Sequence, residues 1–319
     1  MKLLLAAAEG EAYFHLLDDL LIPDLEIARA TTPAEIEAEI ADTDVLYGFP
    51  GPEVIAKAER LRWIQSPGAG VDWVARVPGL VENDAIVVTN TRGAHAPSIA
   101  EHVFGLMLAH TRGIPQALAW QRERYWGRAE GYRALREVKA STMGIIGFGA
   151  IGRAIARRAL AFEMSVIALD AHPVEPGPEL DEVLTADRLP ELLGNSDVVV
   201  VTVPYSASTH HLLNGDNLRL MREDAYLIVI SRGGIVEEEA LAALMTSGHL
   251  AGAALDVTDV EPLPADSPLW AIPNLIITPH LAGASGPKER RCVEILRENM
   301  VRFAAGDELV NVVDKRRGY

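Results

Sequence analysis

The sequence is poor in cysteine and in basic residues. Its one cysteine, Cys292, excludes an intrachain disulfide framework and fits a reducing cytosol. Cys292 lies in a segment with helical periodicity, so we expect a buried structural thiol. Lysine and arginine total 29 against 45 acidic residues, which gives a net charge of −16. This balance argues against nucleic acid or an acidic membrane surface as a partner.

Long apolar runs and metal-binding patterns are also missing. No run reaches the roughly 20 apolar residues of a membrane-spanning helix. The start MKLLLAAAEG imitates a secretory signal, but the run is short, so we interpret it as a first strand and expect a cytoplasmic protein. HExxH and CxxC do not occur, and we expect no metal site. The histidines expected to be structural or exposed are His15, His102, His110, His210, His211 and His249.

Strand-like and helical segments alternate over residues 1–90 and again over 142–278. The strand-like runs are KLLLAAA, LEIARA, DVLYGF, RWIQS and IVVTNT, then TMGIIGF, SVIALD, DVVVVTVP, AYLIVIS, AGAALDV and NLIITP. Between the first runs, TPAEIEAEIAD predicts a helix with Thr32 as its cap and Pro33 in its first turn. Near-continuously apolar runs are typical of parallel strands covered on both faces. A soft prior of roughly 150 residues per domain suggests two domains. The sequence therefore predicts an α/β protein with two doubly wound parallel-sheet (Rossmann-like) domains.

A long helical segment, residues 98–126, separates the two alternating regions and breaks near Gly113 and Pro115. Its first half is apolar on most sides, so we expect it to be buried between domains or between subunits. We interpret this segment as the connector of the two domains.

The segment GIIGFGAIGRAIARRALAFEMSVIALD, residues 144–170, carries a dinucleotide-binding pattern. Gly147 allows a tight turn, Gly149 lets the backbone approach a pyrophosphate, and Gly152 lets helix and strand pack closely. The helix that follows offers free N–H groups to the phosphates. The predicted contacts in this loop are Gly147, Phe148, Gly149, Ala150, Ile151 and Gly152.

Asp170 ends the second strand of this unit, about 20 residues beyond Gly149. A carboxylate at this place accepts hydrogen bonds from ribose hydroxyls and repels a 2′-phosphate. No arginine or lysine follows in AHPVEPGPEL. The sequence therefore favours NAD over NADP, with His172 interpreted as a surface residue rather than a phosphate contact.

Polar residues follow three of the later strands. Arg232 comes after AYLIVIS, Asp256 and Glu261 after AGAALDV, and His280 after NLIIT. In an open parallel sheet these positions share one edge, where ligands bind. Arginine can hold a carboxylate or polarise a carbonyl, histidine can pass a proton near neutral pH, and a carboxylate can orient the ring. Taken singly, Arg232 could form a strand-end salt bridge, Glu261 could be solvated, and His280 could merely close a strand.

Taken together, GFGAIG, SRGGIVEEEAL, ALDVTDVEPLP and PNLIITPHLAG resemble the D-isomer-specific 2-hydroxyacid dehydrogenase family through most of residues 90–285. The resemblance implies that Arg232 binds substrate, that His280 is the acid–base, and that Glu261 is its partner. It implies that Asp256 and Gly283 lie near the nicotinamide. The further cofactor contacts that it implies are Val203, Pro204, Thr209, Ser231, Arg232 and His280. In the segment SPGAGVD, it implies that the amides around Gly68, Ala69, Gly70 and Val71 hold the substrate carboxylate.

The resemblance also implies a discontinuous substrate-binding domain, flavodoxin-like, of residues 1–97 plus 286–319. Residues 98–285 would form the NAD-binding domain, with the active site in a cleft between the two. It implies a homodimer with the helix near residues 98–112 at the interface. Two departures, Tyr205 and Ser231, lie outside the expected acid–base group. They leave the substrate preference more open than the reaction type.

The expected activity is reduction of a small 2-oxo acid to a D-2-hydroxy acid. NADH would deliver hydride to the carbonyl carbon, His280 would protonate the oxygen, and Arg232 would hold the carboxylate. Alternatives are a glyoxylate/hydroxypyruvate reductase using NADPH, or a catalytically weak NAD-sensing protein such as the corepressors with this fold. A D-3-phosphoglycerate dehydrogenase is less expected, since 319 residues leave no room for the regulatory domain that many of those carry. A formate dehydrogenase is less expected because Glu261 stands where an amide would.

Overall fold

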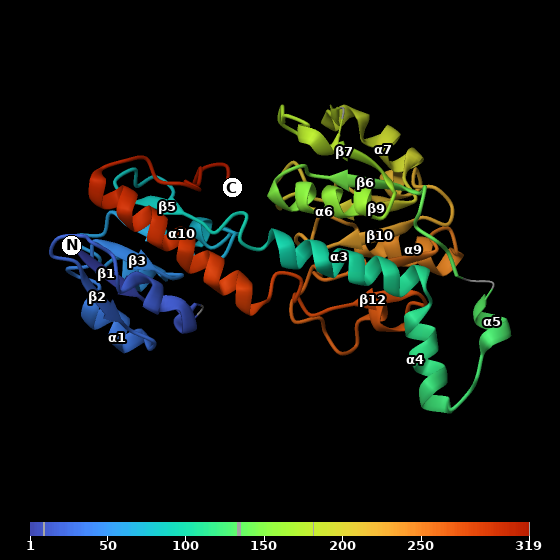
Figure 1. Cartoon of the computed structure of the whole chain (residues 1–319), viewed down its shortest axis with the longest axis horizontal. Coiled ribbons are helices and arrows are strands. Elements are labelled where there is room, and N and C mark those ends of the chain that lie inside the picture. The colour runs from blue at the N-terminus through green and yellow to red at the C-terminus, as the bar shows by residue number, and fades with distance from the viewer. Residues whose placement is uncertain (9, 133–134, 181, 319) are drawn as a thin grey trace. The chain divides into compact units, whose positions relative to one another are not determined.

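The computed structural model describes every residue except 9, 133–134, 181 and 319. The chain divides into two compact units, unit 1 with Met1–His95 and Ser285–Tyr319, and unit 2 with Ala96–Ala284. Each unit contains one parallel sheet with helices packed against it (Figure 1). The predicted fold class, two doubly wound parallel sheets, is confirmed.

Unit 1 has a five-stranded sheet in the order β2-β1-β3-β4-β5, with every pair parallel. This is the flavodoxin-like order, whose switch point lies between β1 and β3. The five predicted strands are all present. The strands are β1 Lys2–Leu5, β2 Glu26–Arg29, β3 Val45–Tyr47, β4 Trp63–Gln65 and β5 Val87–Thr89. The helices and 3₁₀ turns are η1 Glu11–Leu17, α1 Pro33–Glu39, α2 Pro52–Ile55, η2 Val74–Arg76 and α10 Gly286–Ala305.

Local signals in the sequence explain where the helices of unit 1 begin. Thr32 caps α1 in a capping box with Glu35, and proline opens the first turn as predicted. Ser285 accepts a hydrogen bond from the Lys288 amide at the start of α10. Helix α10 buries an apolar stripe against β1 and η1, which ties the C-terminal segment into unit 1. Cys292 is buried in this helix, as predicted.

Unit 2 has a seven-stranded parallel sheet in the order β12-β11-β10-β9-β6-β7-β8. Its strand order reverses at β6 and β9, the switch point where doubly wound sheets bind ligands. The six predicted strands are present, and the two-residue strand β8 was not predicted. The strands are β6 Thr142–Ile146, β7 Ser165–Leu169, β8 Val183–Leu184, β9 Val198–Val201, β10 Tyr226–Val229, β11 Gly252–Leu255 and β12 Leu275–Ile277.

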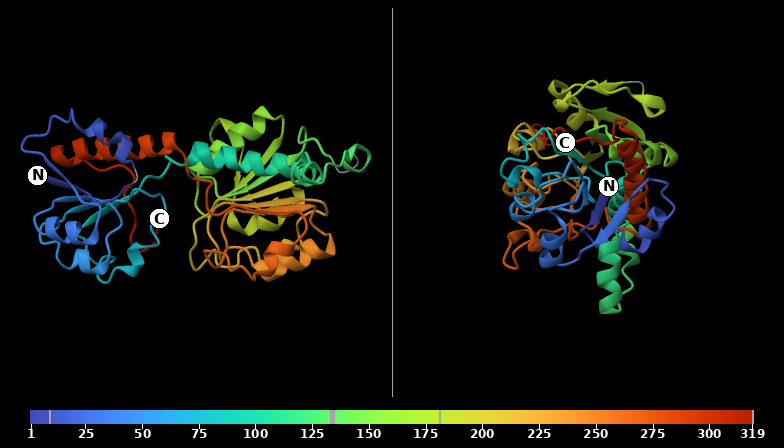
Figure 2. Two further views of the ribbon diagram at one scale, coloured as in Figure 1. Left: turned by 90° about the horizontal axis from the view of Figure 1, so that it is seen from below. Right: turned by 90° about the vertical axis from the view of Figure 1, so that its left-hand side faces the viewer.

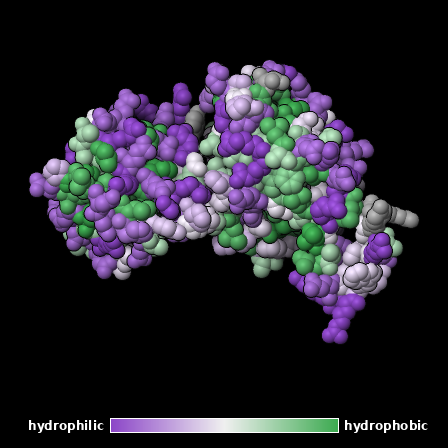
Figure 3. All heavy atoms as spheres, in the orientation of Figure 1, coloured by the Kyte–Doolittle hydropathy of each residue, from purple (hydrophilic) through white to green (hydrophobic). Residues whose placement is uncertain are grey.

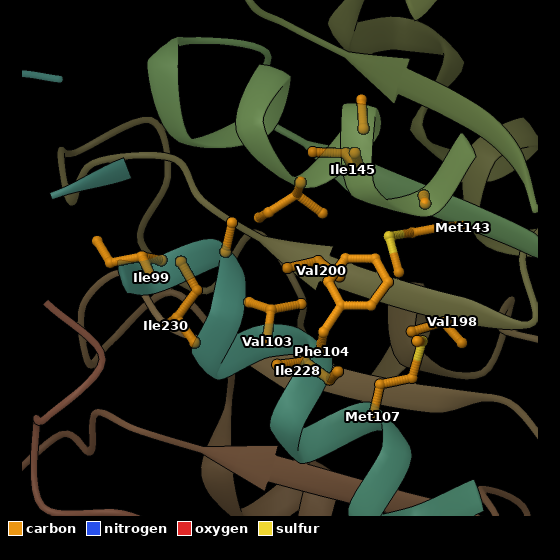
Figure 4. Close-up of a cluster of buried hydrophobic side chains, with 14 of the residues drawn as sticks. Ile99, Val103, Phe104, Met107, Met143, Ile145, Val198, Val200, Ile228 and Ile230 are labelled. Carbon is orange, nitrogen blue, oxygen red and sulfur yellow. The ribbon is translucent and has the colours of Figure 1, made fainter. Parts of the chain in front are cut away.

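Helices cover both faces of this sheet (Figure 2). One face packs on α3 and α6, where Val103 and Phe104 meet Ile145, Val200 and Ile228 (Figure 4). The other face packs on α7, α8 and α9. The helices are α3 Ala96–Thr111, α6 Ala150–Ala161, α7 Leu189–Asn195, α8 Gly215–Leu218 and α9 Glu238–Ser247. The 3₁₀ turns are η3 Gly177–Glu179, η4 Ala186–Arg188 and η5 Pro268–Ala271.

The burial of the apolar helix α3 does not require a second domain or subunit. Its apolar residues are buried in the core of unit 2 itself, against α6 and β10. The pattern identified a buried helix correctly, but the sheet of its own unit is the partner. The predicted break lies at Gly113, which has a left-handed backbone and precedes the next helix.

Beyond that break the chain forms an arm of two helices, α4 Ile114–Glu123 and α5 Arg128–Tyr132, which projects from unit 2 (Figures 1 and 2). Helix α4 has no buried residue. Several large apolar side chains of the arm are instead exposed, among them Leu118, Tyr125 and Trp126, which is 88% exposed. Hydrophobic surface is also visible near the base of the arm (Figure 3). None of the helices in the described ranges is long and apolar enough to cross a membrane.

Candidate active site

The glycine loop between β6 and α6 has the geometry that its sequence predicts. Gly147 has a φ of +100°, the left-handed region that favours glycine. A side chain at Gly152 would overlap the carbonyl oxygen of Gly147, so this glycine lets α6 pack closely on the loop. A Cβ at Gly149 would meet no atom within 4 Å. The space beside Gly149 is therefore open to a ligand, whereas the space beside Gly152 is filled by the loop itself.

The start of α6 can receive a phosphate group. Gly149 is the N-cap, and no side chain accepts a hydrogen bond at this end. The first N–H groups of a helix have no intrahelical partner, and together with the helix dipole they attract an anion. The carboxylate of Asp170, at the end of β7, accepts from the Phe148 amide at 2.8 Å and from the His172 amide at 3.1 Å. The loop thus leaves an open helix end that can receive a phosphate, and the Asp170 carboxylate lies directly beside this loop.

The candidate catalytic residues follow strands that are neighbours in the sheet of unit 2. Val229 of β10 pairs with Leu255 of β11, and Leu255 pairs with Ile277 of β12. The three strands therefore end level with one another, at the carboxyl edge. Arg232, Asp256 and His280 come within three residues of these ends. The structure thus brings the predicted arginine, carboxylates and histidine to the same edge.

His280 and Glu261 form a hydrogen-bonded pair. The His280 Nδ1 lies 2.9 Å from the Glu261 Oε2, and both side chains remain partly exposed. The other oxygen of Glu261 accepts from the Thr258 amide at 3.3 Å, which fixes the carboxylate. His280 has a φ of +54°, uncommon for a residue with a side chain. With Nδ1 bound to the carboxylate, Nε2 is the nitrogen left to face a substrate.

Arg232 stands on a loop that is packed tightly against the loop after β11. Its Nη1 donates to the Ser231 carbonyl at 2.8 Å. A side chain at Gly233 would overlap the backbone of Thr258, so only glycine allows this approach. The Gly234 amide donates to Asp259 at 2.5 Å. The loops that carry the arginine and the glutamate are therefore packed directly against each other.

Glu238, at the start of α9, joins the same packed loops. It accepts from the Asp259 amide at 2.8 Å. Burial raises the pKa of Glu238 above its ordinary value, and the nearby Asp259 charge acts in the same direction, while the hydrogen bond opposes them.

Asp256 is buried in a network of hydrogen bonds. Its side chain is only 1% exposed. Its carboxylate accepts from the Thr278 hydroxyl at 2.5 Å and from the amides of Leu281 and Ala282, each at 2.9 Å. His102 of α3 lies 3.5 Å from the same carboxylate. His102, which we expected to be structural or exposed, is 23% exposed and makes a structural contact here.

Val203, Pro204 and Thr209 belong to the loop after β9, at the switch point. The Thr209 hydroxyl donates to the Pro204 carbonyl at 2.8 Å and accepts from the Ser206 amide at 2.7 Å. Thr209 therefore closes this loop on itself. Tyr205, the departure noted in the sequence, is partly exposed, and its ring packs against Gly234.

In unit 1 the segment after β4 forms a loop whose carbonyl groups are tied down. The Pro67 carbonyl accepts from the Thr91 hydroxyl, the Gly68 carbonyl from the Thr91 amide, and the Ala69 carbonyl from the Asn90 side chain. By contrast, no group in the described parts of the chain accepts from the amides of Ala69, Gly70 or Val71. Of the predicted substrate residues, Ala69, Gly70 and Val71 thus present a row of N–H donors, an arrangement that binds anions, whereas the Gly68 amide donates to the Ser66 hydroxyl at 3.3 Å.

Two aromatic side chains, which the sequence did not single out, stand beside this loop. Phe49 follows β3, is 49% exposed, and would lie 3.2 Å from a side chain at Gly68. The Trp73 ring meets Phe49 edge to face with ring centroids 6.1 Å apart. Sequence reasoning could find only their loops, because the side chains meet across two strand ends.

Comparison with known proteins agrees with this geometry. Residues 104–282 match the model of the D-isomer specific 2-hydroxyacid dehydrogenase, NAD binding domain. The matched family and the names of the relatives indicate an oxidoreductase acting on the CH–OH group of 2-hydroxy acids, with a nicotinamide dinucleotide site. The chain belongs to the D-isomer-specific 2-hydroxyacid dehydrogenase family.

The individual relatives carry different names. The chain is 34% identical over 297 residues to a D-3-phosphoglycerate dehydrogenase of Methanocaldococcus jannaschii, covering 92% of this chain and 56% of that protein. It is 34% identical over 271 residues to a glyoxylate reductase of Korarchaeum cryptofilum, covering 82% and 79%. A D-isomer specific 2-hydroxyacid dehydrogenase of Xanthobacter autotrophicus Py2, solved with NADPH and MES, is 30% identical with a TM-score of 0.84, covering 99% and 100%.

Proposed function

We propose that the protein is an NAD-dependent D-2-hydroxyacid dehydrogenase that works as a reductase of small 2-oxo acids. The observation that carries this proposal is the 2.9 Å contact between His280 and Glu261, on the sheet edge shared with Arg232. Histidine with an orienting carboxylate is an acid–base pair, and the neighbouring arginine supplies a fixed positive charge.

The roles of the residues follow from their atoms. NADH, when bound, supplies the hydride that reduces the C2 carbonyl. Glu261 holds the Nδ1–H of His280, so that the protonated ring presents Nε2–H to the carbonyl oxygen and transfers this proton as the C2–O bond becomes single. Glu261 also stabilises the imidazolium before transfer. The guanidinium of Arg232 binds the substrate carboxylate and polarises the carbonyl.

In unit 1, the amides of Ala69, Gly70 and Val71 are proposed to bind the substrate carboxylate. The aromatic surface of Phe49 would then lie beside the substrate's side chain. Relatives named glyoxylate reductase support a small 2-oxo acid as substrate. Residues 1–97 with 286–319 are proposed as the substrate-binding domain, and residues 98–285 as the cofactor-binding domain.

The preference for NAD over NADP rests on Asp170. Its carboxylate lies at the end of β7 and accepts from the Phe148 amide of the glycine loop, where a 2′-phosphate would meet its negative charge. The Xanthobacter relative bound NADPH, so a glyoxylate/hydroxypyruvate reductase using NADPH is the competing proposal. Kinetics with each cofactor decide between them: a kcat/KM for NADPH above that for NADH would refute the preference.

We also propose that the protein is a cytoplasmic homodimer. The arm of α4 and α5 supports this, since Leu118, Tyr125 and Trp126 leave apolar surface that a second copy would cover. The single buried cysteine fits a reducing compartment. Sedimentation of wild type and of Trp126→Glu tests the dimer. A wild type that sediments as a monomer would overturn it.

The activity is tested by NADH oxidation with glyoxylate, hydroxypyruvate, pyruvate, phenylpyruvate and branched 2-oxo acids. His280→Gln should lower kcat at least about 100-fold while NADH affinity stays within about twofold, because the residue acts in proton transfer. Near-normal turnover of this variant would remove His280 from the mechanism. Intact NADH binding without turnover of any 2-oxo acid by wild type would favour the NAD-sensing alternative.

A further inference from the structure

The loop that carries His280 is wrapped around the buried carboxylate of Asp256. That carboxylate accepts from the Thr278 hydroxyl at 2.5 Å and from the Leu281 and Ala282 amides at 2.9 Å. The backbone carbonyl of Asp256 accepts from the His280 amide at 2.8 Å. Asp256 therefore binds the loop on both sides of His280.

Helix α3 holds the same loop from the other side. Ser98 and His102 lie one turn apart and so share a face of the helix. The Ser98 hydroxyl donates to the Gly283 carbonyl at 3.3 Å, and the His102 Nε2 lies 3.1 Å from the Thr278 hydroxyl oxygen. Since that hydroxyl donates its proton to Asp256, its lone pairs are left to accept from the His102 Nε2–H.

These contacts constrain the backbone conformation of His280. A φ of +54° is unfavourable for a residue with a side chain, and it persists only where the surroundings determine it. The hydrogen bonds on either side of His280 supply that constraint. Asp256, in turn, is buried and needs all its donors, because an unpaired buried carboxylate is very unfavourable.

We propose that His102 and Thr278 are positioning residues that act with Asp256 to hold His280 in its reactive orientation. A chain of hydrogen bonds runs from helix α3 through the Thr278 hydroxyl to the Asp256 carboxylate, and from there to the amides beyond His280. Asp256 then acts as an internal anchor of the loop that carries His280. The expected effect of these residues on catalysis rests on the proposed function. Their hydrogen bonding to the loop that carries His280 does not rest on it.

The chain offers matched variants. His102→Leu and Thr278→Val remove the hydrogen bonds with little change of volume, and His102→Gln and Thr278→Ser restore a donor at each place. His110→Leu is the control, because His110 also lies on α3 and also binds the sheet, through a 2.8 Å contact with the Ala253 carbonyl. Ala253 lies at the start of β11, whereas Asp256 lies just past its other end.

The first measurement is hydrogen exchange of the peptide that contains Leu281 and Ala282. We expect exchange to be about tenfold faster in His102→Leu and Thr278→Val, and within about twofold of wild type in His102→Gln, Thr278→Ser and His110→Leu. Unchanged exchange in the first two variants, or the same acceleration in His110→Leu, would overturn the proposal. This result does not depend on any activity.

The second measurement is single-turnover reduction with saturating NADH, unlabelled or deuterated at the transferred position. His102→Leu and Thr278→Val should slow hydride transfer about tenfold or more, with NADH Kd within about twofold of wild type. In steady-state turnover with the same two cofactors, the isotope effect on kcat should rise. Recovery in His102→Gln and Thr278→Ser supports the positioning role. Unchanged hydride transfer, or a change confined to NADH Kd, refutes it. If the wild type shows no turnover, the proposed function is refuted instead. The hydrogen-exchange measurement then tests by itself whether His102 and Thr278 hold the loop.

Discussion

Replacing Gly152 with alanine puts a methyl group where no space exists. The new Cβ would overlap the carbonyl oxygen of Gly147 and would lie 3.3 Å from the Ile145 Cγ2. A backbone oxygen cannot rotate away as a flexible side chain can, so the loop or α6 must move. Overpacking of this kind costs typically 1–3 kcal/mol, and we take about 3 kcal/mol because the clash is with backbone. For a unit of this size that corresponds to a loss of about 6–12 °C in Tm.

Gly149→Ala, three residues earlier, should behave differently. Its Cβ would meet no atom within 4 Å, and its φ of −79° suits any residue. Alanine is a poorer N-cap than glycine, but it also restricts the unfolded chain, and the two effects of about 0.5–1 kcal/mol oppose each other. Stability should therefore change by less than about 1 kcal/mol. The methyl group would occupy the space proposed for the pyrophosphate, so NADH affinity should fall at least about tenfold, or about 1.4 kcal/mol.

The assay is a pair of measurements on each variant. Thermal unfolding without cofactor gives the stability change, and quenching of protein fluorescence by NADH gives Kd. Gly105→Ala, in helix α3, has no atom within 4 Å of its Cβ and controls for the loss of a glycine elsewhere in unit 2. A Gly149→Ala variant with unchanged NADH Kd would refute the placement of the cofactor at this loop. A Gly152→Ala variant as stable as wild type would refute the packing argument.

Three further predictions concern single side chains. Glu261→Gln should lower kcat about tenfold or more without changing NADH Kd, because a neutral amide stabilises the His280 imidazolium less. A kcat equal to that of wild type would contradict the proposed pairing of Glu261 with His280. Burial lowers the pKa of His110 from its ordinary 6.5, against the opposing hydrogen bond to Ala253. The stability linked to neutral His110 is present above pH 6.5 and is lost as pH falls through the lowered pKa. His110→Gln should therefore flatten the acid side of a plot of Tm against pH. An unchanged plot would argue against a lowered pKa of His110. Burial raises the pKa of Cys292, so a thiol reagent at pH 8 should label it slowly in the native protein and rapidly in denaturant; equal rates would contradict its burial.

Most of the sheet architecture could be predicted because its strands carry their own signal. Strands such as Val198–Val201 are apolar throughout, since helices cover both faces. The two-residue strand β8 was not predicted because Val183 and Leu184 are too short a run to show any period. Helix α3 shows a different limit: its composition indicates that it is buried, but it does not indicate which surface buries it. That depends on the sheet order, which brings β10 beneath the helix.

In the candidate site, too, some features could be predicted from the sequence and others could not. Arg232, Glu261 and His280 were predictable because the ends of parallel strands share an edge, so that three short sequence motifs are enough to place them together. The environment of Asp256 was not predictable. An aspartate just past a strand end can face a ligand or turn inward, and the residue type is the same in both cases. Its partners come from the loop after β12 and from α3, segments far apart in the chain, and only their packing shows that its carboxylate is buried and hydrogen-bonded. The proposed role of His102 follows from that packing. His102 lies on a buried helix, and its hydrogen-bond partner Thr278 belongs to the segment that leads to the proposed catalytic histidine.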